Sequence, residues 1–423
     1  MTVCVIGLGY IGLPTAAILA TKGHTVCGVD IDRDLVGTIN QGGFHSQEPD
    51  LDVLVRSAVQ SGNLVVQETP MPADVFIIAV PTPIGDNRQP DLSAVDVAAA
   101  ALAPHLVPGN LVILESTSPV GATERVGEHL KQIRTELQIA PAEDGGGKGP
   151  SEPVYLAHCP ERVLPGEILQ ELVGVDRVVG GVDSASTERA CAFYANFVQG
   201  RILTTDARTA ELVKLAENAY RDVNIAYANE LSLVCDRLDI DVMTLIELAN
   251  HHPRVDILRP GPGVGGHCIA VDPWFIVASV PDATRLIPTA RQVNDAKPGF
   301  VVSRIEAAAS KFDQPVIVCL GLAFKADVDD LRGSPSVEIV RRLAANSDCR
   351  ILAVEPHIAK LPPLLENFVN VDLVSLPAAI EQADLVVSLV NHREFDMIVQ
   401  ADLAGKVLVD TLGIWRGLLG PAR

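Results

Sequence analysis

The sequence predicts an α/β protein with two doubly wound parallel-sheet domains joined by a central helical domain that contains a long helix. Three observations lead to this prediction. Short apolar segments alternate with helical patterns over roughly the first 200 residues and again over the last third of the chain. Between these regions, residues 207–238 keep one helical pattern for longer than most globular helices do. At 423 residues the chain has room for several domains, which we expect at 1–203, 204–298 and 299–423.

The first segment has the pattern of a nucleotide-binding βαβ unit. The apolar strand 2–6 is followed by the Gly-x-Gly-x-x-Gly turn of residues 7–12, an Ala-rich helix at 13–21 and a second strand at 25–29. In such a Rossmann-like unit, the pyrophosphate of a dinucleotide lies on the N-terminus of the helix. Asp30 follows the second strand, where an acidic residue binds the adenosine ribose of NAD and disfavours NADP. We therefore expect an NAD site here.

Two loops at later strand ends are candidates for the same cofactor site. Ligands of doubly wound sheets lie beyond the carboxyl ends of the strands, so Val80-Pro81-Thr82-Pro83 and Glu115–Gly121 should face the cofactor. Pro and Thr are also ordinary turn residues, and each loop could serve only as a turn. Residues 139–153 form a Pro/Gly-rich insertion that we interpret as a mobile surface loop. Further strands are expected at 64–66, 75–80, 111–115, 154–159 and 177–179.

The helical pattern of residues 207–238 predicts a long helix that joins domains. Lys214 and Asn218 are one turn apart and therefore share a face of this helix. They could act together on a ligand, or they could be a solvated lysine with a polar neighbour. Core-like spacing is shown by Leu212, Leu215, Ala219, Val223, Ala226, Leu231 and Val234.

The last third of the chain predicts a second unit that resembles a nucleotide-binding fold. Leu322-Ala323-Phe324-Lys325 stands where a dinucleotide site would have its further glycines. Lys325 and Arg332 flank three aspartates, and in so acidic a chain they are candidate phosphate or sugar ligands. A surface ion-pair cluster is the alternative. Strands are expected at 315–321, 351–354 (ending at Glu355), 384–389 and 407–410, and a helix at 334–345.

The segment Gly261–Trp274 carries a candidate catalytic thiol. Its four glycines and two prolines predict a tightly turning loop whose backbone can approach a ligand closely. The loop contains Cys268, with Asp272 four residues later. A free cysteine is usually a small buried hydrophobe, but a loop so rich in glycine favours a reactive thiol here.

Composition restricts the class of protein. A formal net charge of −20 and a pI near 4.8 argue against nucleic acid and against an anionic membrane surface as partners. The longest apolar runs have the length of strands, so we expect no membrane span. The eight cysteines lack Cys-x-x-Cys spacing, which suits a reducing cytoplasm and argues against a disulfide framework and against a zinc or other metal site.

Six motifs in one order along the whole chain give a family resemblance. They are Gly7–Gly12, Ser116–Gly121, Cys159-Pro160-Glu161-Arg162, Lys214–Asn218, Gly265–Cys268 with Asp272, and Gly321–Lys325 with Arg332. In order and spacing the chain resembles the UDP-glucose/GDP-mannose dehydrogenase family. The resemblance implies an N-terminal NAD domain, a central helical domain that forms a homodimer, and a C-terminal domain that binds the UDP moiety of a UDP-sugar.

The resemblance also implies oxidation of a sugar hydroxymethyl group to a carboxylate in two hydride transfers, with two NAD. The second transfer needs a nucleophile, because an aldehyde carbon gives up a hydride readily only after a thiolate has added to it. By resemblance, Cys268 supplies the thiolate, and Glu161 deprotonates the water that hydrolyses the thioester. The oxyanions would be stabilised by Lys214 and Asn218, while Asp272 holds a water or a lysine near the thiol and Thr117 positions the reacting groups.

Motifs and resemblance together give the remaining candidate residues. Arg33 could lie along the adenine or the ribose, or it could be a solvated helix start. Cofactor contacts are expected from Gly7, Gly9, Tyr10, Ile11, Gly12, Asp30, Asp32, Arg33, Pro81, Thr82, Ser116 and Thr117. Substrate contacts are expected from Arg162, Val163, Leu164, Lys214, Asn218, Arg254 (which could reach a neighbouring subunit), Gly265, His267, Lys325 and Arg332.

Two positions of the sequence leave the identity of the substrate sugar undecided. The UDP-glucose branch of the family has a glutamate where this chain has Pro165 and a lysine where it has Val271. The segments 160–166 and 267–274 are most similar to the branch that oxidises UDP-N-acetyl-D-mannosamine, with UDP-N-acetylglucosamine and UDP-glucose as alternatives. A single-step hydroxyacid dehydrogenase would not need Cys268, and an NAD-binding scaffold would lack the catalytic residues of the second half.

Overall fold

The computed structural model describes residues 1–42, 48, 50–85, 87–141, 152–163, 166–347 and 349–419. Leu164 and Pro165, which the sequence places near the sugar, lie outside the described residues, as do residues 142–151 of the predicted insertion. Packing divides the chain into two compact units. Unit 1 comprises Met1–Glu217 and Trp274–Pro281, and unit 2 comprises Asn218–Pro273 and Asp282–Arg423. The three domains expected from the sequence stay a prediction.

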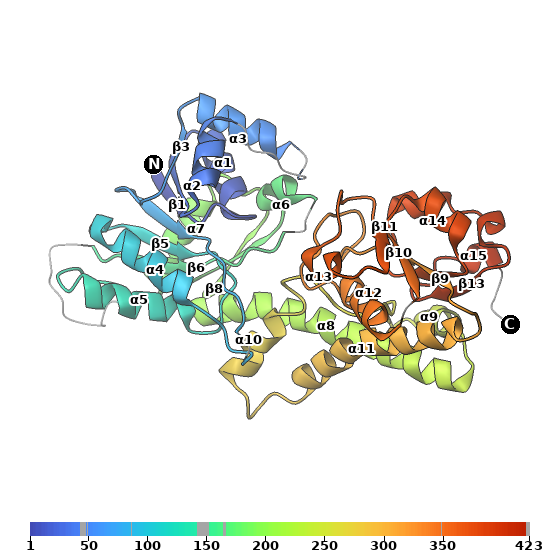
Figure 1. Ribbon diagram of the computed structural model, residues 1–423. Helices are drawn as coiled ribbons and strands as arrows, with labels where there is room; N and C mark the ends of the chain where they lie inside the picture. Colours follow the sequence, from blue (N-terminus) through green and yellow to red (C-terminus); the bar gives the residue numbers. More distant parts are fainter. Residues whose placement is uncertain are drawn as a thin grey trace. The chain divides into compact units, whose positions relative to one another are not determined.

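Unit 1 is built on one eight-stranded sheet with the order β3-β2-β1-β4-β5-β6-β7-β8. Figure 1 shows the helices of this unit around the sheet. Its strands are β1 (Thr2–Ile6), β2 (Thr25–Val29), β3 (Leu64–Gln67), β4 (Val75–Ile78), β5 (Leu111–Leu114), β6 (Tyr155–His158), β7 (Arg177–Gly181) and β8 (Ile202–Asp206). Its helices are α1 (Gly12–Thr21), α2 (Arg33–Asn40), α3 (Leu51–Gln60), α4 (Ser93–Leu102), α5 (Ala122–Ile133), α6 (Ile168–Gly174) and α7 (Ser184–Tyr194), with a 3-10 turn at Ala103–His105.

Alternating side chains of the central strands feed two cores, one on each face of this sheet. Val3 and Val5 of β1 pack in the core that α1, α3, α6 and α7 cover, whereas Cys4 and Ile6 pack in the core that α4 and α5 cover. The pairing of β6 with β7 is antiparallel, so the sheet is mostly parallel rather than wholly so. The predicted fold class is confirmed. The edge strand β8 was not expected, because its Thr204, Thr205 and Asp206 give no apolar pattern.

Unit 2 contains a five-stranded, all-parallel sheet with the order β11-β10-β9-β12-β13. Helices α11 and α12 pack on one face, and α14 with short 3-10 turns packs on the other. Its strands are β9 (Val316–Leu320), β10 (Arg350–Val354), β11 (Val371–Leu373), β12 (Leu385–Ser388) and β13 (Val407–Asp410). Its helices are α9 (Val242–Asn250), α11 (Leu286–Ala309), α12 (Pro335–Asn346), α13 (Pro363–Glu366), α14 (Leu376–Gln382) and α15 (Arg416–Leu419), and 3-10 turns lie at Arg393–Met397 and Gln400–Leu403.

Two helices continue from one unit into the other: α8 (Ala207–Leu238) and α10 (Asp272–Ser279). The long helix predicted at 207–238 is confirmed with those bounds. The expectation that Leu212 and Val234 are core residues was wrong, since their side chains are exposed. Within the described part of the chain, no helix combines the length and the apolar character needed to cross a membrane.

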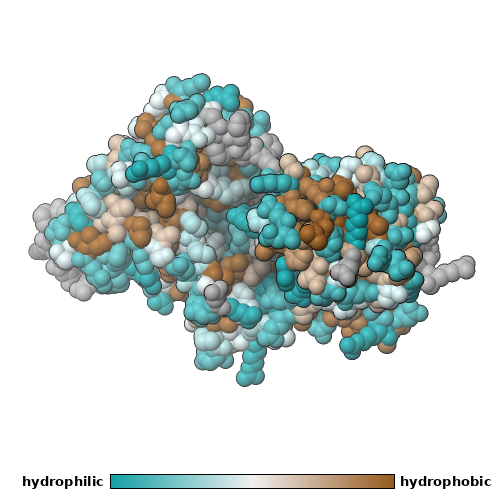
Figure 2. Space-filling model, in the orientation of Figure 1, coloured by the Kyte–Doolittle hydropathy of each residue, from teal (hydrophilic) through white to brown (hydrophobic). Residues whose placement is uncertain are grey.

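The visible surface is mostly polar (Figure 2). Figure 2 shows mostly polar side chains on the visible face, with apolar residues in smaller groups. One such group lies on unit 2 over the part where Figure 1 places α13, a helix whose Leu364 is exposed.

Candidate active site

The glycine turn after β1 has the geometry that a dinucleotide requires. Gly7 has a φ of 93°, and an added Cβ would lie 2.5 Å from the carbonyl oxygen of Ala79, just beyond the end of β4. A Cβ on Gly12 would collide with the carbonyl oxygen of Gly7, so α1 can begin directly against the turn only with glycine there. Around Gly9, no described atom lies within 4 Å of a Cβ position, which leaves space at the N-terminus of α1. These features fit a bound pyrophosphate.

Asp30 lies beside this turn. Its Oδ2 accepts a hydrogen bond from the Leu8 N–H at 2.8 Å, and its Oδ1 accepts one from the Asp32 N–H at 3.0 Å. The carboxylate is therefore held at the end of β2, where the ribose of NAD binds in this kind of fold. Asp32 instead caps α2 by accepting from the N–H groups of Asp34 and Leu35. The exposed Arg33 pairs with Glu68, and these contacts favour the solvated helix start over a cofactor role.

The two predicted loops at the ends of β4 and β5 are hydrogen-bonded to each other. The Thr82 hydroxyl donates to the Thr117 carbonyl at 2.5 Å, and the Ser116 hydroxyl donates to the Val80 carbonyl at 2.7 Å. Ser116 is buried, whereas Pro81 is exposed. The loops thus lie together at the carboxyl edge of the sheet, next to the Gly7 turn, as expected from the sequence. Cofactor contacts from their side chains stay a prediction.

Glu48 was not among the residues predicted from the sequence. The Tyr10 hydroxyl donates to its Oε1 at 2.5 Å, and the Gly166 N–H donates to the same oxygen at 2.7 Å. Glu48 therefore connects the glycine turn, between Gly9 and Ile11, with the segment that follows the predicted base Glu161. No motif surrounds Glu48 in the sequence, so nothing local indicates this role.

Glu161 and Lys214 interact within unit 1. Burial raises the pKa of Glu161, and the nearby positive charge of Lys214 partly opposes that rise. The Val163 N–H donates to the Glu161 carboxylate. Arg162 binds both carboxylate oxygens of Glu217 on α8, at 2.6 and 3.1 Å, which fastens this loop to the helix that carries Lys214. A carboxylate with a raised pKa suits a general base near neutral pH.

A second unpredicted carboxylate fixes the first turns of α8. Glu211 is buried and accepts from the Gly121 N–H at 2.6 Å, the Thr123 N–H at 2.8 Å and the Thr123 hydroxyl at 2.7 Å. These donors lie at the N-terminus of α5, directly after the Ser116–Gly121 loop. Lys214 follows Glu211 by three residues and so projects from the same side of α8.

In unit 2, the thiol loop is joined to α8. The Asn218 amide donates to Asp272 Oδ2 at 2.6 Å, and the Asp272 carboxylate is buried. The N–H groups of Val271 and Asp272 donate to the Cys268 carbonyl at 3.0 and 2.8 Å. The Cys268 residue itself is exposed. The structure therefore brings together three of the predicted catalytic residues: Cys268, Asp272 and Asn218.

The glycines of this loop serve mainly for packing within the protein. A Cβ on Gly265 would lie 2.6 Å from Pro335 Cδ and 2.7 Å from the Gly333 carbonyl oxygen. Gly266 has a φ of 82° and faces the ring of Phe324. The glycines were predicted to let a ligand approach closely, but at these two positions the neighbours belong to the loop between β9 and α12 and to the first residue of α12.

The candidate substrate ligands of unit 2 are only partly assembled. Arg332 binds Asp330 through Nε and Nη2, at 2.9 and 2.6 Å, and His267 Nδ1 lies 3.9 Å from the same carboxyl group. Burial alone would raise the pKa of Asp330, but Arg332 holds it below its usual range. Lys325 and Arg254 are exposed outside this cluster. Arg332 therefore belongs to an ion-pair cluster, which was the alternative to a substrate ligand. Substrate binding by Arg332, His267, Lys325 and Arg254 stays a prediction.

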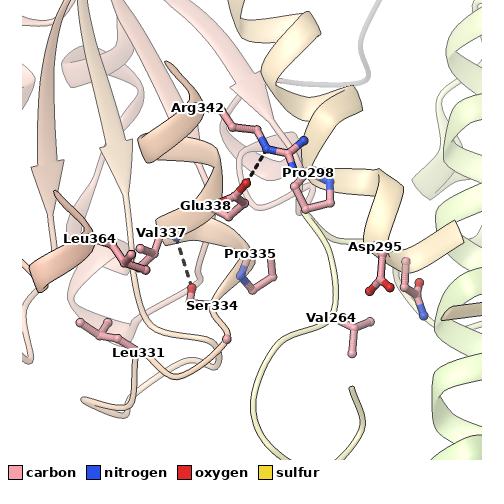
Figure 3. Close-up of a pocket in the computed structure, with 12 residues that line it drawn as sticks. Val264, Asp295, Pro298, Leu331, Ser334, Pro335, Val337, Glu338, Arg342 and Leu364 are labelled. Atoms are coloured by element: carbon pink, nitrogen blue, oxygen red, sulfur yellow. Dashed lines mark hydrogen bonds and ion pairs between the residues drawn. The ribbon is translucent and has the colours of Figure 1, made fainter. Parts of the chain in front are cut away.

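A cavity of about 270 Å³ lies in unit 2, between the thiol loop, α11, α12 and α13. Figure 3 shows Glu338 paired with Arg342 on α12 and Val264 of the loop at the rim. Its lining contains none of the predicted site residues. The lining residues are Val264, Asn294, Asp295, Pro298, Leu331, Gly333, Ser334, Pro335, Val337, Glu338, Arg342 and Leu364.

One cluster among the described residues has metal-ligating groups close enough for an ion: Asp327, His357, His392 and Glu394. His392 is already engaged at both ring nitrogens. Its Nδ1 accepts from the Asp327 N–H at 3.0 Å, and its Nε2 lies 3.0 Å from Glu355 Oε2. Because a ring nitrogen that accepts an N–H has no lone pair left for a cation, His392 is committed to holding the fold.

Matches to known proteins extend over nearly the whole chain. Profiles of the UDP-glucose/GDP-mannose dehydrogenase family match residues 1–198 (NAD binding domain), 208–296 (central domain) and 318–417 (UDP binding domain). An NDP-N-acetyl-D-galactosaminuronic acid dehydrogenase of Ralstonia nicotianae is 54% identical over 98% of this chain and 96% of its own length. A UDP-N-acetyl-D-mannosamine dehydrogenase of Campylobacter jejuni is 53% identical over 95% and 97%. The solved UDP-D-ManNAc dehydrogenase of Pyrococcus horikoshii has a TM-score of 0.85 at 36% identity, covering 98% of this chain and 96% of that one.

Proposed function

Since the chain belongs to the UDP-glucose/GDP-mannose dehydrogenase family and is an NAD-dependent UDP-sugar dehydrogenase, we propose that its substrate is UDP-N-acetyl-D-mannosamine. The product is UDP-N-acetyl-D-mannosaminuronate, formed by oxidation of the hydroxymethyl group to a carboxylate. The observation that carries the proposed mechanism is Cys268. Of the eight cysteines, all within the described residues, it is the one that is exposed, and it lies on a loop whose Asp272 is held by Asn218.

The first half of the reaction converts the alcohol to an aldehyde. NAD, which the Gly7 turn and Asp30 would hold, would supply the hydride acceptor. As the hydroxyl loses its proton, negative charge develops on its oxygen, and Lys214 with Asn218 stabilises that charge. A well-placed donor of this kind contributes roughly 3–4 kcal/mol to transition-state stabilisation. Thr117 positions the reacting groups.

The second half requires a covalent bond to the protein. The Cys268 thiolate adds to the aldehyde carbon and gives a thiohemiacetal, whose carbon then releases its hydride to a second NAD and becomes a thioester. Glu161 takes a proton from water, the hydroxide attacks the thioester carbon, and the carbon–sulfur bond breaks. The thiol leaves and the sugar carries a carboxylate. The pKa of Glu161, raised by burial and partly lowered by Lys214, supports this role as base.

The choice of sugar rests on the relatives and on one side chain. Val271, next to Asp272, is uncharged and partly buried, which suits an N-acetyl group better than a lysine would. A pocket that hydrogen-bonds an amide rejects a bare hydroxyl, because its own polar groups would be left unpaired. The 54% identity to an NDP-N-acetyl-D-galactosaminuronic acid dehydrogenase supports UDP-N-acetyl-D-galactosamine as the second candidate.

The test is NADH release with four substrates: UDP-N-acetylmannosamine, UDP-N-acetylgalactosamine, UDP-N-acetylglucosamine and UDP-glucose. We expect two NADH per sugar and the highest kcat/KM with UDP-N-acetylmannosamine. If UDP-N-acetylgalactosamine is the best substrate, the second candidate replaces the first. UDP-glucose as the best substrate would exclude both.

The covalent step has its own test. Cys268→Ala should lower acid formation by several orders of magnitude, because no thiolate is then present to add to the aldehyde carbon. Cys349→Ala is the matched control, since Cys349 is a half-buried thiol of the same unit that packs against the apolar core. Near wild-type acid formation by Cys268→Ala would remove the covalent mechanism.

We further propose that the enzyme is a homodimer in the cytoplasm, where its thiols stay reduced. Tyr220, Tyr227 and Val234 lie seven residues apart on α8 and are 70%, 54% and 45% exposed, which makes an apolar stripe on one side of the helix. Burial of such a stripe between two copies supports dimerisation through the central region. Sedimentation of wild type and Tyr227→Glu tests this proposal.

A further inference from the structure

Both ends of the thiol loop are hydrogen-bonded to side chains of α8. At the end of the loop, the Asn218 amide donates to Asp272 at 2.6 Å. At its beginning, the Gly261 N–H donates to Asn229 Oδ1 at 3.0 Å. Asn218 and Asn229 are about three turns apart and lie within about 20° of each other around the helix axis, since each residue turns the helix by about 100°. One face of α8 therefore holds the loop at two points.

Asn229 is itself fixed by a buried polar network between α8 and α11. Its amide donates to Asn294 Oδ1 at 2.9 Å, and the Asn294 amide donates to Asp222 Oδ1 at 2.8 Å. Arg291 donates to the same Asp222 oxygen at 2.6 Å. All four side chains are at most 2% exposed. Such a network resists rearrangement, because a buried group that leaves its partner loses a hydrogen bond that water cannot replace.

The network contains no residue of the proposed chemistry, yet it ends on the backbone of the thiol loop. Figure 3 shows the loop at Val264 passing beside α11, the helix that supplies Asn294 and Arg291. Between Gly261 and Cys268 the backbone turns through Pro262 and three further glycines, and glycines restrict the chain little on their own. The middle of this segment packs on the loop between β9 and α12, where the Gly266 N–H donates to the Arg332 carbonyl at 3.2 Å. The position of the thiol therefore depends on this contact and on the anchors at the two ends, of which Asn229 holds the first.

We propose that Asn229, fixed by Asn294, Asp222 and Arg291, is a positioning residue for the Cys268 thiol. The inference rests on the proposed covalent role of Cys268. The second half of the reaction needs the sulfur within reach of the aldehyde carbon, whereas the first half does not involve the thiol. Displacement of a reacting atom by about 1 Å can slow a step by about a hundredfold.

The test separates the two halves. In Asn229→Ala, the Gly261 N–H and Asn294 Oδ1 lose their partner, and the loop start is released. We expect acid formation to fall by about 10–100-fold and the NADH yield to fall from two per sugar towards one. The aldehyde that escapes would be trapped with semicarbazide and identified by mass spectrometry. Asn224→Ala is the matched control, because this asparagine of α8 bonds only the Tyr220 carbonyl of its own helix among the described contacts.

A second variant approaches the same hydrogen bond from the loop. Gly261→Pro removes the N–H that donates to Asn229 Oδ1 but leaves the four side chains of the buried network in place, and Gly261→Ala, which keeps the N–H, is its reference. The yield should again fall towards one in the proline variant. A folded Asn229→Ala and a folded Gly261→Pro that both retain two NADH per sugar would overturn the proposal, since a merely structural loss lowers both halves equally and leaves the yield at two.

The outcome also distinguishes this inference from the proposed function. If Cys268→Ala still forms acid, the covalent mechanism itself is wrong. If Cys268→Ala stops at the aldehyde while both anchor variants keep a yield of two, only the positioning role is wrong.

Discussion

The two sheets share a strand pattern but differ in what happens at the end of the second strand. The order β3-β2-β1-β4-β5 in unit 1 is repeated as β11-β10-β9-β12-β13 in unit 2. In both, an acid follows the second strand and accepts hydrogen bonds from the turn after the first strand. Asp30 accepts from the Leu8 N–H at 2.8 Å, and Glu355 accepts from Leu322 and Ala323 at 2.7 and 2.9 Å.

The difference lies in what else touches the acid. Asp30 is partly exposed, and α1 begins directly at the glycine turn beside it. Glu355 is 4% exposed and is closed off by His392, whose Nε2 lies 3.0 Å from the carboxylate. The helix after β9 begins only at Pro335, after a long loop that packs on the thiol loop. The same topology thus leaves its acid partly exposed in unit 1 and uses it as an internal support in unit 2.

The largest effect should come from removing that support. Glu355→Ala leaves two buried N–H groups and the His392 ring without an acceptor, and breaking a buried pair in this way costs about 3–5 kcal/mol. Urea unfolding of a Trp274→Phe background, in which Trp415 of unit 2 is the remaining tryptophan of the sequence, measures the loss by fluorescence. Glu366→Ala, at an exposed glutamate of α13, is the control. A loss below about 1 kcal/mol would mean that Glu355 does not support the turn.

The next effect concerns Asp30 and the cofactor. A carboxylate next to the ribose repels a 2′-phosphate, so wild type should prefer NAD to NADP by at least about a hundredfold in kcat/KM, or about 2.7 kcal/mol. Asp30→Ala should lose most of that preference. Asp34→Ala, at an exposed acid in the first turn of α2, serves as the control. If wild type used NAD and NADP equally well, Asp30 would not contact the ribose, and it would not differ from Glu355 in binding a ligand.

The stability that Glu355 contributes should depend on pH. Burial alone would raise the pKa of Glu355, but hydrogen bonds from His392 and from the Leu322 N–H hold it below its usual range. A carboxyl with a depressed folded pKa stabilises the protein above its unfolded pKa of about 4.3, and this contribution is lost as pH falls through the folded value. The stability difference between wild type and Glu355→Gln should therefore stay constant from pH 7 to about pH 5 and narrow as the pH falls below about 4.3. A difference that also stays constant below that pH would contradict the assignment.

The smallest effect should come from the exposed cap in unit 1. Asp32 accepts from the Asp34 and Leu35 N–H groups at 3.0 and 3.1 Å at the start of α2. Asp32→Ala should cost about 1 kcal/mol in urea unfolding, and Asp32→Asn, which keeps an acceptor, should restore most of it. If Asp32→Ala lowered the free energy of unfolding as much as Glu355→Ala does, the difference in exposure between the two acids would not explain their contributions to stability.

Local patterns in the sequence alone determined the elements whose formation depends on residues close to one another in the chain. The glycine turn at Gly7, the acid at Asp30 and the bounds of α8 were all predicted, because strand and helix periods and turn chemistry act within a few residues. The thiol loop was recognised in the same way. The edge strand β8 was not predicted, because only its first two residues are apolar, and the edge strand β11 was not predicted, because it has only three residues.

Only the tertiary structure decided which polar groups support the candidate site. Glu48 meets Gly166 across 118 residues, Glu211 meets Gly121 across 90, and Asn229 meets Gly261 across 32. The same holds for His392, which closes off Glu355 across 37 residues. No local pattern encodes such pairs, because a buried polar side chain is satisfied by whichever segment the fold brings to it, and that segment is chosen by the packing of the whole chain.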